Sequence, residues 1–341
     1  MTVTAVGAGV RVRRFKGEDQ AAVLDLIHRD LLLGRPVVTA AVLEQSFEQD
    51  ELYCEVLISS TGEVQGVVSW ADRAREDAGQ VLWLHCRNDE QHLAETLLRH
   101  VLAQLGRRTV YAYAEPTVLA PVGLPVRNRP GTRRALEVCG FSGTDHARYL
   151  HHYLDTLSPR LYTIADLTPC PDAPGWQLRL RDRDGTRIGE ACISPPIGGT
   201  AKLEWVSLAP QHRNLGHILL EQCLTNLADR GIQHVTAQLA APDHPHHEAA
   251  LQLHEEVGFT VIDHLHTYTR LRGGSITKAA LFRSRRVVDT QLDAHRLPRI
   301  SLSGENPASN RDEDQGRDAE AESQDCKASA QGVVAAAVLG P

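Results

Sequence analysis

The sequence predicts an α/β fold, more narrowly α+β, in which two similar domains each build a mixed, mainly antiparallel sheet flanked by helices. Residues 203–271 show the clearest order of elements, which is strand, turn, helix, strand, helix and closing strands. A weaker copy of that order precedes it at a separation of about 120 residues, which indicates an internal duplication. A chain of 341 residues is long enough for two such domains and a tail.

The second copy begins with a strand at residues 203–208 and continues into an amphipathic helix that starts near Gly216. Apolar residues of this helix recur at three- and four-residue spacings, as one buried face requires, and Gly231 ends it. The elements expected after it are a strand at 234–239, a Pro/His-rich loop at 242–246, a helix at 248–257 and closing strands at 260–262 and 266–271.

The first copy has the same kinds of element in the same order, although its local signals are weaker. Its expected elements are a strand at 9–15, one or two helices at 18–33, a hairpin of strands at 52–59 and 64–71, a strand at 81–86, a helix at 89–105, a strand at 109–114, a helical segment at 132–141 and a closing strand at 149–153.

The junction between strand 203–208 and the helix after it has the chemistry of an anion site. A helix N-terminus leaves several backbone N–H groups unpaired and carries the positive end of the helix dipole. Gln211 and Arg213 add side-chain donors, and Gly216 has no Cβ to keep a ligand away from the backbone. The junction therefore predicts a nucleotide-like cofactor that is held by its phosphates.

Two motifs in this copy resemble the GNAT superfamily of acyl-CoA-dependent N-acyltransferases. The first is Gln211-His-Arg-Asn-Leu-Gly216, in which Asn214 stands where the family has its first glycine. The second is Leu253-His-Glu-Glu-Val-Gly-Phe259, in which His254 stands where the family has a tyrosine. The resemblance covers roughly residues 160–272, and two motifs with the right elements between them are more specific than one.

The resemblance implies a direct acetyl transfer from acetyl-CoA, the acyl-donor substrate, to an amine. Strands 204–208 and 235–239 would part near a bulge, and the pantetheine arm would pair with the first of them like an added strand. The residues that the resemblance assigns to the coenzyme are Val206, Leu208, Gln211, His212, Arg213, Asn214, Leu215, Gly216, His217 and His247.

The same resemblance assigns two proton-transfer groups. Glu204 lies where the family often places a glutamate that relays a proton from the amine, and His254 is the expected donor to the leaving thiolate. A solvated Glu204 and a surface His254 are the alternatives. The acceptor is expected to be a small-molecule amine or a peptide amine.

The first copy is expected to be degenerate, because Arg87-Asn-Asp-Glu-Gln-His92 replaces the phosphate turn. Asp89 and Glu90 would repel a pyrophosphate, and Asp89 is interpreted as the N-cap of the helix that follows it. The predicted domains are a degenerate unit at 1–155, an acetyl-CoA-binding unit at 156–273 and a largely disordered tail at 274–341, in which residues 310–325 are nearly free of large apolar groups.

Composition limits the other possibilities. A net charge of −7 gives no reason to expect nucleic acid as a partner, and no apolar run approaches membrane-spanning length. Seven scattered cysteines without a Cys-x-x-Cys pair, and an N-terminus without a secretory pattern, fit a cytoplasmic protein. The spacing of the histidines predicts no metal site. A monomer and a homodimer are both expected possibilities.

Two further readings stay open. The chain could be a non-catalytic acyl-CoA sensor or scaffold, because one glycine and the tyrosine of the family motifs are missing. It could instead acylate a thiol, a hydroxyl or a protein lysine. The second copy also has too few residues before Trp176 for the two helices that shape the family's acceptor site, so the first copy is a candidate to shape it.

Overall fold

The structure is a computed structural model that describes residues 4–6, 9–47, 52–117, 119–154, 165–170, 174–244 and 246–272. All of these residues fall within one compact unit. The tail expected over residues 274–341 lies outside the described residues. The boundary expected between residues 155 and 156 stays a prediction, and residues 4–154 and 165–272 are called the N-terminal half and the C-terminal half below.

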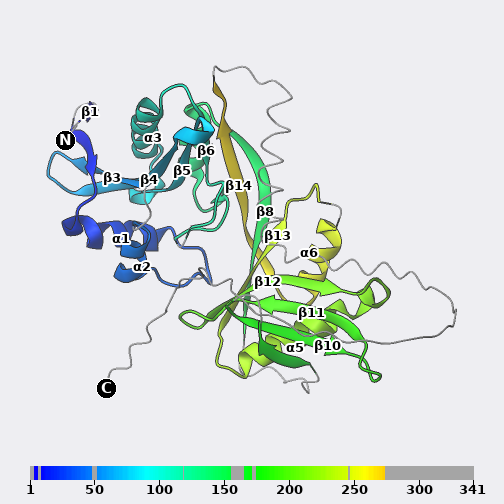
Figure 1. Cartoon of the computed structure of the whole chain (residues 1–341). Helices are drawn as coiled ribbons and strands as arrows, with labels where there is room; N and C mark the ends of the chain where they lie inside the picture. The colour runs from blue at the N-terminus through cyan, green and yellow to red at the C-terminus, as the bar shows by residue number, and fades with distance from the viewer. Residues whose placement is uncertain are drawn as a thin grey trace, which may run out of the picture. The chain divides into compact units, whose positions relative to one another are not determined.

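The N-terminal half carries helices on both faces of its strands (Figure 1). Helices α1 and α2 pack on one face, and α3 and α4 pack on the other, each over a separate buried apolar cluster. Its elements are β1 (Thr4–Val6), β2 (Val10–Arg14), η1 (Gly17–Asp19), α1 (Gln20–Arg29), α2 (Ala40–Gln45), β3 (Leu52–Ser59), β4 (Val64–Arg73), η2 (Ala74–Glu76), β5 (Ala78–Cys86), η3 (Arg87–Asp89), α3 (Gln91–Leu105), β6 (Thr109–Ala112), β7 (Leu124–Pro125), α4 (Pro130–Val138) and β8 (Ser142–Tyr153).

The C-terminal half repeats the later part of that order with fewer helices. Its apolar cluster lies between the strands and α5, and α6 packs against α5 and β13. Its elements are β9 (Asp166–Pro169), β10 (Trp176–Arg181), β11 (Arg187–Ile193), β12 (Thr200–Leu208), η4 (Pro210–Leu215), α5 (Gly216–Ala228), β13 (His234–Ala240), α6 (His247–Glu256) and β14 (Thr260–Arg270).

The described strands form one mixed sheet whose order is β1-β2-β3-β4-β5-β6-β14-β8-β13-β12-β11-β10-β9, with β7 paired to β14 beside this path. Most neighbours are antiparallel, and the parallel pairs are β5 with β6 and β12 with β13. This arrangement confirms the predicted fold class of two sheet-and-helix units. The expected closing strands at 260–262 and 266–271 are one strand, β14, which keeps its pairing across two register shifts.

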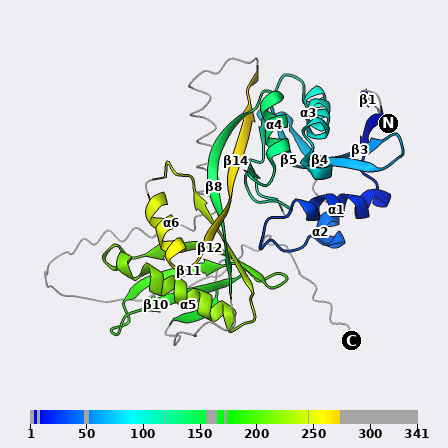
Figure 2. The same cartoon turned by 180° about the vertical axis from the view of Figure 1, so that it is seen from behind.

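The closing strands are exchanged between the halves. Strand β8 ends the N-terminal half in sequence, yet it pairs with β13 of the C-terminal half along His234–Ala240. Strand β14 ends the C-terminal half in sequence, yet its residues Tyr268 and Arg270 pair with β6 of the N-terminal half. The two exchanged strands also pair with each other and lie side by side in both views (Figures 1 and 2).

The exchange reaches the apolar cores. Tyr268 of β14 is buried in the cluster built by α3, α4 and the N-terminal strands. Leu150 of β8 is buried in the cluster beneath α5. Full burial of a large apolar side chain contributes about 1.5–3 kcal/mol, so each half draws part of its stability from the other half's last strand.

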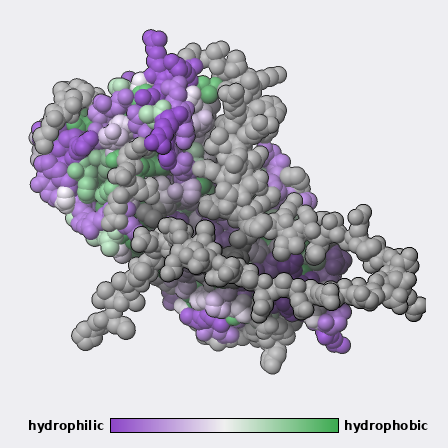
Figure 3. Space-filling view, viewed as in Figure 1, coloured by the Kyte–Doolittle hydropathy of each residue, from purple (hydrophilic) through white to green (hydrophobic). Residues whose placement is uncertain are grey.

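The surface of the described part is mostly polar. Purple, hydrophilic residues make up most of the coloured surface in Figure 3, with smaller green areas. No helix among the described residues has the length and apolar character needed to cross a membrane. The large apolar side chains that are exposed are Leu33, Val37, Val138, Tyr153 and Ile197.

Ending the chain at Phe259 should unfold both halves, because β6 then loses its partner strand and the N-terminal core loses Tyr268. Circular dichroism and calorimetry would measure this. A matched chain that ends at Arg272 keeps β14 and should melt in one cooperative transition. A Phe259-terminated chain that retains the thermal transition of the N-terminal half would contradict the exchange.

Candidate functional site

The two central strands of the C-terminal half part after a short parallel stretch. Pairing of β12 with β13 runs from Thr200 opposite His234 to Leu203 opposite Ala237 and then stops. On its other edge, β12 pairs with β11, and the register shifts so that Glu204 is the extra residue between Leu203 and Trp205. A bulge bends its strand, so the bulge at Glu204 accounts for the point at which the strands separate.

Beyond this bulge, no described strand pairs with the edge of β12 that faces away from β11. The N–H of Ala209 donates to the Ile188 carbonyl at 2.9 Å, and Ser207 lies opposite Glu190, so the backbone groups of the odd-numbered residues face β11. The backbone groups of Val206 and Leu208 therefore face the side that β13 has left. Both side chains are half-buried against the C-terminal core.

The turn expected after β12 is a short helix of its own. Residues 210–215 form the 3-10 helix η4, and the N–H of His212 already donates to the Ala209 carbonyl at 2.8 Å. Pro210 favours this turn because its ring fixes φ at a helical value. Helix α5 starts directly after this 3-10 helix, where Leu215 is the N-cap and no side chain caps the helix.

The side chains around this helix start are polar and accessible. Gln211, Asn214 and His217 are exposed, and His212 is half-buried. Arg213 belongs to the same 3-10 turn. The first turn of α5 contains no acidic residue, so nothing there opposes the positive end of the helix dipole.

Gly216 has a packing role that the sequence did not predict, and its predicted role in ligand approach stays a prediction. It is buried, and an added Cβ would lie 2.9 Å from side-chain atoms of both Leu208 and Leu253. The glycine therefore lets the start of α5 pack closely on the end of β12 and on α6. The sequence reasoning attributed it to ligand approach, because the packing partners are distant in sequence.

The start of α6 lies at the same end of the sheet as the start of α5. His247 is the first residue of α6 and is half-buried. Its Nδ1 carries the proton and donates to the Ala240 carbonyl, because a carbonyl can only accept. The contact ties α6 to the end of β13, and it fixes the tautomer of a residue that was predicted to bind the coenzyme.

His254 is buried in the middle of the packing between α6 and the sheet. Its side chain is 4% exposed, its ring meets Phe259 edge-on at 5.2 Å, and Nδ1 donates to the Ala250 carbonyl at 2.7 Å. Burial lowers the pKa of His254 below its ordinary value, and the Ala250 hydrogen bond offsets this only in part. At neutral pH the ring is therefore mainly neutral, and its Nε2 is a hydrogen-bond acceptor.

Glu204 lies at the surface of the bulge, with 37% of its side chain exposed. Lys202 Nζ donates to its Oε2 at 2.6 Å, since residues i and i+2 of a strand project on one face. The structure thus places Glu204 where β12 and β13 part, and it places His254 among buried residues of α6.

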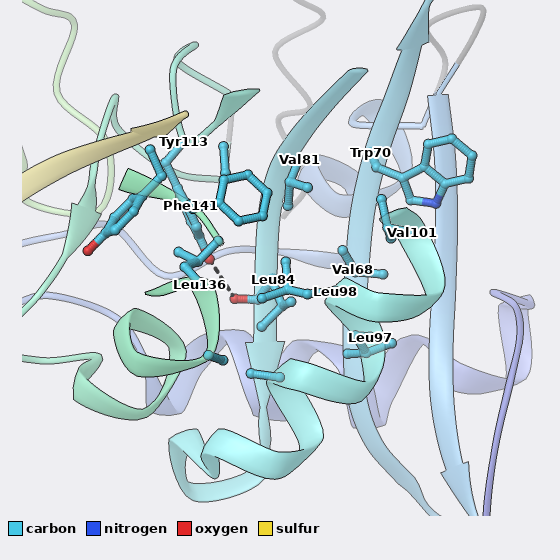
Figure 4. Close-up of a cluster of buried hydrophobic side chains, with 14 of the residues drawn as sticks. Val68, Trp70, Val81, Leu84, Leu97, Leu98, Val101, Tyr113, Leu136 and Phe141 are labelled. Carbon is cyan, nitrogen blue, oxygen red and sulfur yellow. Dashed lines mark hydrogen bonds between the residues drawn. The ribbon is translucent and has the colours of Figure 1, made fainter. Parts of the chain in front are cut away.

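Two central strands also part in the N-terminal half, but there side chains fill the space between them. Pairing of β5 with β6 stops at Val81 opposite Ala112, and a register shift leaves Leu82 as the extra residue. Leu82 is thus the counterpart of Glu204, and Leu84 is the counterpart of Val206. The Leu84 carbonyl accepts from Tyr113 Oη at 3.3 Å, shown as the dashed line in Figure 4, and from Arg129 Nη2 at 3.0 Å.

Arg129 holds this filled region together. It is 2% exposed, and it contacts the carboxylates of Asp30 and Asp89 at 3.0 Å each. Asp89 also accepts from the backbone N–H groups of Gly131 and Thr132, so it occupies the N-terminus of α4. The predicted role of Asp89 as N-cap of α3 is therefore wrong, because left-handed backbone at Asn88 and Asp89 turns the carboxylate toward α4.

Sequence reasoning missed Arg129 altogether. Its two carboxylate partners lie 40 or more residues away in the chain, and no local pattern connects them to it. Among the described residues, no group of three or more His, Cys, Asp or Glu side chains is placed to hold a metal ion.

Comparison with known proteins gives a consistent fold. No protein-family model matches this sequence, and no curated protein is similar to it. Among solved structures, the chain is similar to a GCN5-related N-acetyltransferase from Sphaerobacter thermophilus, with a TM-score of 0.53 at 15% identity over 79% of this chain and 98% of the other. It is also similar to a tandem GNAT protein of the clavulanic acid biosynthesis pathway, with a TM-score of 0.51 at 16% identity over 78% of this chain and 100% of the other. These similarities and the strand topology show that the chain has the GNAT fold.

One coenzyme A should bind per chain, because only the C-terminal half has a free strand edge beside an uncapped helix start. In the N-terminal half, Arg129 and Tyr113 occupy the matching carbonyl. Isothermal titration calorimetry with coenzyme A should give a stoichiometry near one. Two equivalent sites would show that the N-terminal region opens.

His217→Glu should separate two effects of charge at the start of α5. The carboxylate should stabilise the free protein by roughly 0.3–1 kcal/mol through the helix dipole. It should weaken coenzyme A binding by roughly tenfold or more, because like charges repel where phosphates bind. Ala40→Glu puts the same charge at the exposed start of α2 and should leave coenzyme affinity unchanged. Equal coenzyme A affinities of the two variants would show that the phosphates do not bind at the start of α5.

Proposed function

We propose that the C-terminal half is an acetyl-CoA-dependent N-acetyltransferase. The observation that carries this proposal is the edge of β12 that no described strand covers, where the backbone groups of Val206 and Leu208 face away from β11 near the start of α5. The matching region of the N-terminal half is closed by its own side chains. One half therefore supports binding and the other supports the fold.

The proposed binding mode uses backbone groups. In this mode the phosphates lie against the backbone amides of residues 216–218 at the start of α5, and Gln211 supplies a further donor. The pantetheine amides pair with Val206 and Leu208 as an added strand would. The acyl carbonyl then lies near the bulge, where a free backbone N–H can stabilise the oxyanion.

The proposed reaction is direct transfer. The amine nitrogen bonds to the thioester carbonyl carbon, the C–S bond breaks, and the amine gives up a proton to Glu204 or to water beside it. The departing thiolate takes a proton from His254 or from solvent. Much of the rate would come from holding the amine and the thioester together.

A non-catalytic acyl-CoA-binding module is the second candidate, and the burial of His254 in place of the family's tyrosine favours it. An acceptor screen decides between them. Purified protein is given acetyl-CoA and a panel of amines and amine-bearing peptides, and free thiol is measured. The enzyme is supported if thiol release depends on an amine and if Glu204→Gln strongly lowers this release. Coenzyme binding without thiol release from any amine supports the module.

His254→Ala tests the proton donor through the pH profile. A histidine loses its charge as pH rises through its pKa, and burial lowers this pKa below about 6.5. If imidazolium is the donor, wild-type turnover should fall as pH rises toward neutrality. At a pH below the pKa of His254, His254→Ala should lower turnover by roughly 10²–10⁴-fold.

His254→Tyr should restore part of this loss and move the alkaline limb upward, because a phenol keeps its proton to about pH 10. Affinity for acetyl-CoA should change little in either variant. A wild-type profile that stays flat above pH 6.5, with an alanine variant of equal turnover, would assign the proton to solvent.

A further inference from the structure

Two cysteines from separate strands meet on one face of the C-terminal sheet. Cys192 belongs to β11, and Cys170 directly follows the last residue of β9. A hydrogen bond joins their thiols, although β10 lies between the two strands. No Cys-x-x-Cys motif marks this pair in the sequence, because its members are brought together only by the sheet.

The pairing of the strands places both side chains on the same face. Gln177 of β10 lies opposite Thr168 of β9 and opposite Cys192 of β11. The N–H of Cys170 donates to the Gly175 carbonyl at 2.9 Å, so the ladder continues to Cys170. Alternate residues of a strand share a face, so Cys170 and Cys192 both project from the face opposite the apolar cluster beneath α5.

A glycine leaves the space between the two thiols open. Gly175 has no side chain, and a Cβ there would lie 2.2 Å from the Ile193 carbonyl oxygen. The next residue of β10 on this face is Gln177, whose amide donates to Glu190 at 3.0 Å and accepts from Arg179 at 2.6 Å. These bonds hold the Gln177 side chain away from Gly175, so the thiols of β9 and β11 can meet across β10.

Cys192 also lies beside the bulge that carries Glu204. It is opposite Trp205, and the register shift that leaves Glu204 unpaired falls directly after it. Burial raises the pKa of Cys192 to about 11, and the neighbouring Cys170 thiol and the Glu204 carboxylate add to this effect. A displacement of Cys192 therefore acts at the point where β12 bends.

The two thiols differ in access and in reactivity. Cys170 is half-buried, whereas Cys192 is 7% exposed. The thiolate is the nucleophilic form of cysteine, and the raised pKa keeps Cys192 protonated at neutral pH. An oxidant therefore reaches Cys170 first, and Cys192 is placed to react second.

We propose that Cys170 and Cys192 are a reversible disulfide site that hydrogen peroxide oxidises and that slows acetyl transfer at Glu204. The effect on transfer rests on the proposed function. The Cys170 sulfur takes one peroxide oxygen as a sulfenic acid, the O–O bond breaks, and the other oxygen leaves as water with the thiol proton. The Cys192 sulfur then bonds to the Cys170 sulfur, the S–O bond breaks, and the hydroxyl leaves as water with the Cys192 proton. Two thiols thus lose two electrons, which reduce the peroxide to two waters.

Formation of the bond must move the strands that carry the two sulfurs. Bonded sulfur atoms lie about 2.05 Å apart, well inside the contact distance of two thiols, so the bond draws Cys192 toward β9. Trp205 pairs with Cys192, so the bulge at Glu204 is displaced with it. A shift of about 1 Å at a reacting group can cost roughly 10²-fold in rate. Oxidised protein should lose acetyl transfer by up to that factor, and dithiothreitol should restore it.

Peptide mapping tests the bond without any assay of activity. The protein is treated with hydrogen peroxide, free thiols are blocked with iodoacetamide, and the chain is digested with trypsin. Cys170 is then the only cysteine of peptide 161–179, and Cys192 is the only cysteine of peptide 188–202. Mass spectrometry should find these two peptides joined after peroxide treatment and separate after reduction with dithiothreitol.

Cys139→Ser is the matched control, because Cys139 is also half-buried and lies at the end of α4 in the N-terminal half. It should keep the joined peptides, whereas Cys170→Ser should lose them. Thermal unfolding of each variant reports whether it is folded. The absence of joined peptides from peroxide-treated wild-type protein would overturn the inference, and so would a Cys170 oxidised to a sulfinic acid beside a Cys192 that iodoacetamide still blocks.

The effect on transfer is measured separately, as acetylated product formed from an amine that the acceptor screen identifies. Wild-type protein should lose turnover after peroxide treatment and regain it after reduction. Cys170→Ser should keep its turnover under both conditions. Joined peptides with unchanged turnover would overturn the control of transfer. If no amine is acetylated, joined peptides still support the disulfide site, and the failure belongs to the proposed function.

Discussion

The pairing of β8 with β14 is the constraint on which the rest of the structure depends. It makes one continuous sheet of two duplicated halves and gives each core an apolar side chain from the other half. It also brings Asp263 of β14 to the N-terminal half, where its buried carboxylate accepts from the amides of Arg127 and Asn128. That contact fixes the turn before Arg129, so the closed state of the N-terminal half depends on the C-terminal strand.

The two halves resolve one structural problem in opposite ways. Where two central strands part, each leaves backbone groups that need hydrogen-bond partners. In the N-terminal half the Leu84 carbonyl accepts hydrogen bonds from Tyr113 and Arg129, and two carboxylates balance the charge of Arg129. In the C-terminal half, no described side chain donates a hydrogen bond to the matching carbonyl of Val206, and the nearby Glu204 and Lys202 pair with each other at the surface.

Sequence reasoning reached what is local. Periodicity gave α5 and α6, alternation gave most strands, and the repeated order of elements gave the duplicated GNAT fold. It failed where a partner is distant in the chain. The packing of Gly216 against Leu253, the turn of Asp89 toward α4 and the exchange of β8 for β14 all depend on contacts that no window of residues contains.

Glu204 and His254 differ in how easily each can exchange a proton in the proposed reaction. An amine must lose a proton and a thiolate must gain one, so the reaction as a whole needs no net proton. Glu204 is exposed at the point where the strands part and can exchange protons with water. His254 is neutral, buried against Phe259 and bound through Nδ1 to its own helix, so its ring also anchors α6 to the sheet. A proton passed from Glu204 through solvent can return to the thiolate without His254. The proposed transfer therefore does not require His254 as a proton donor.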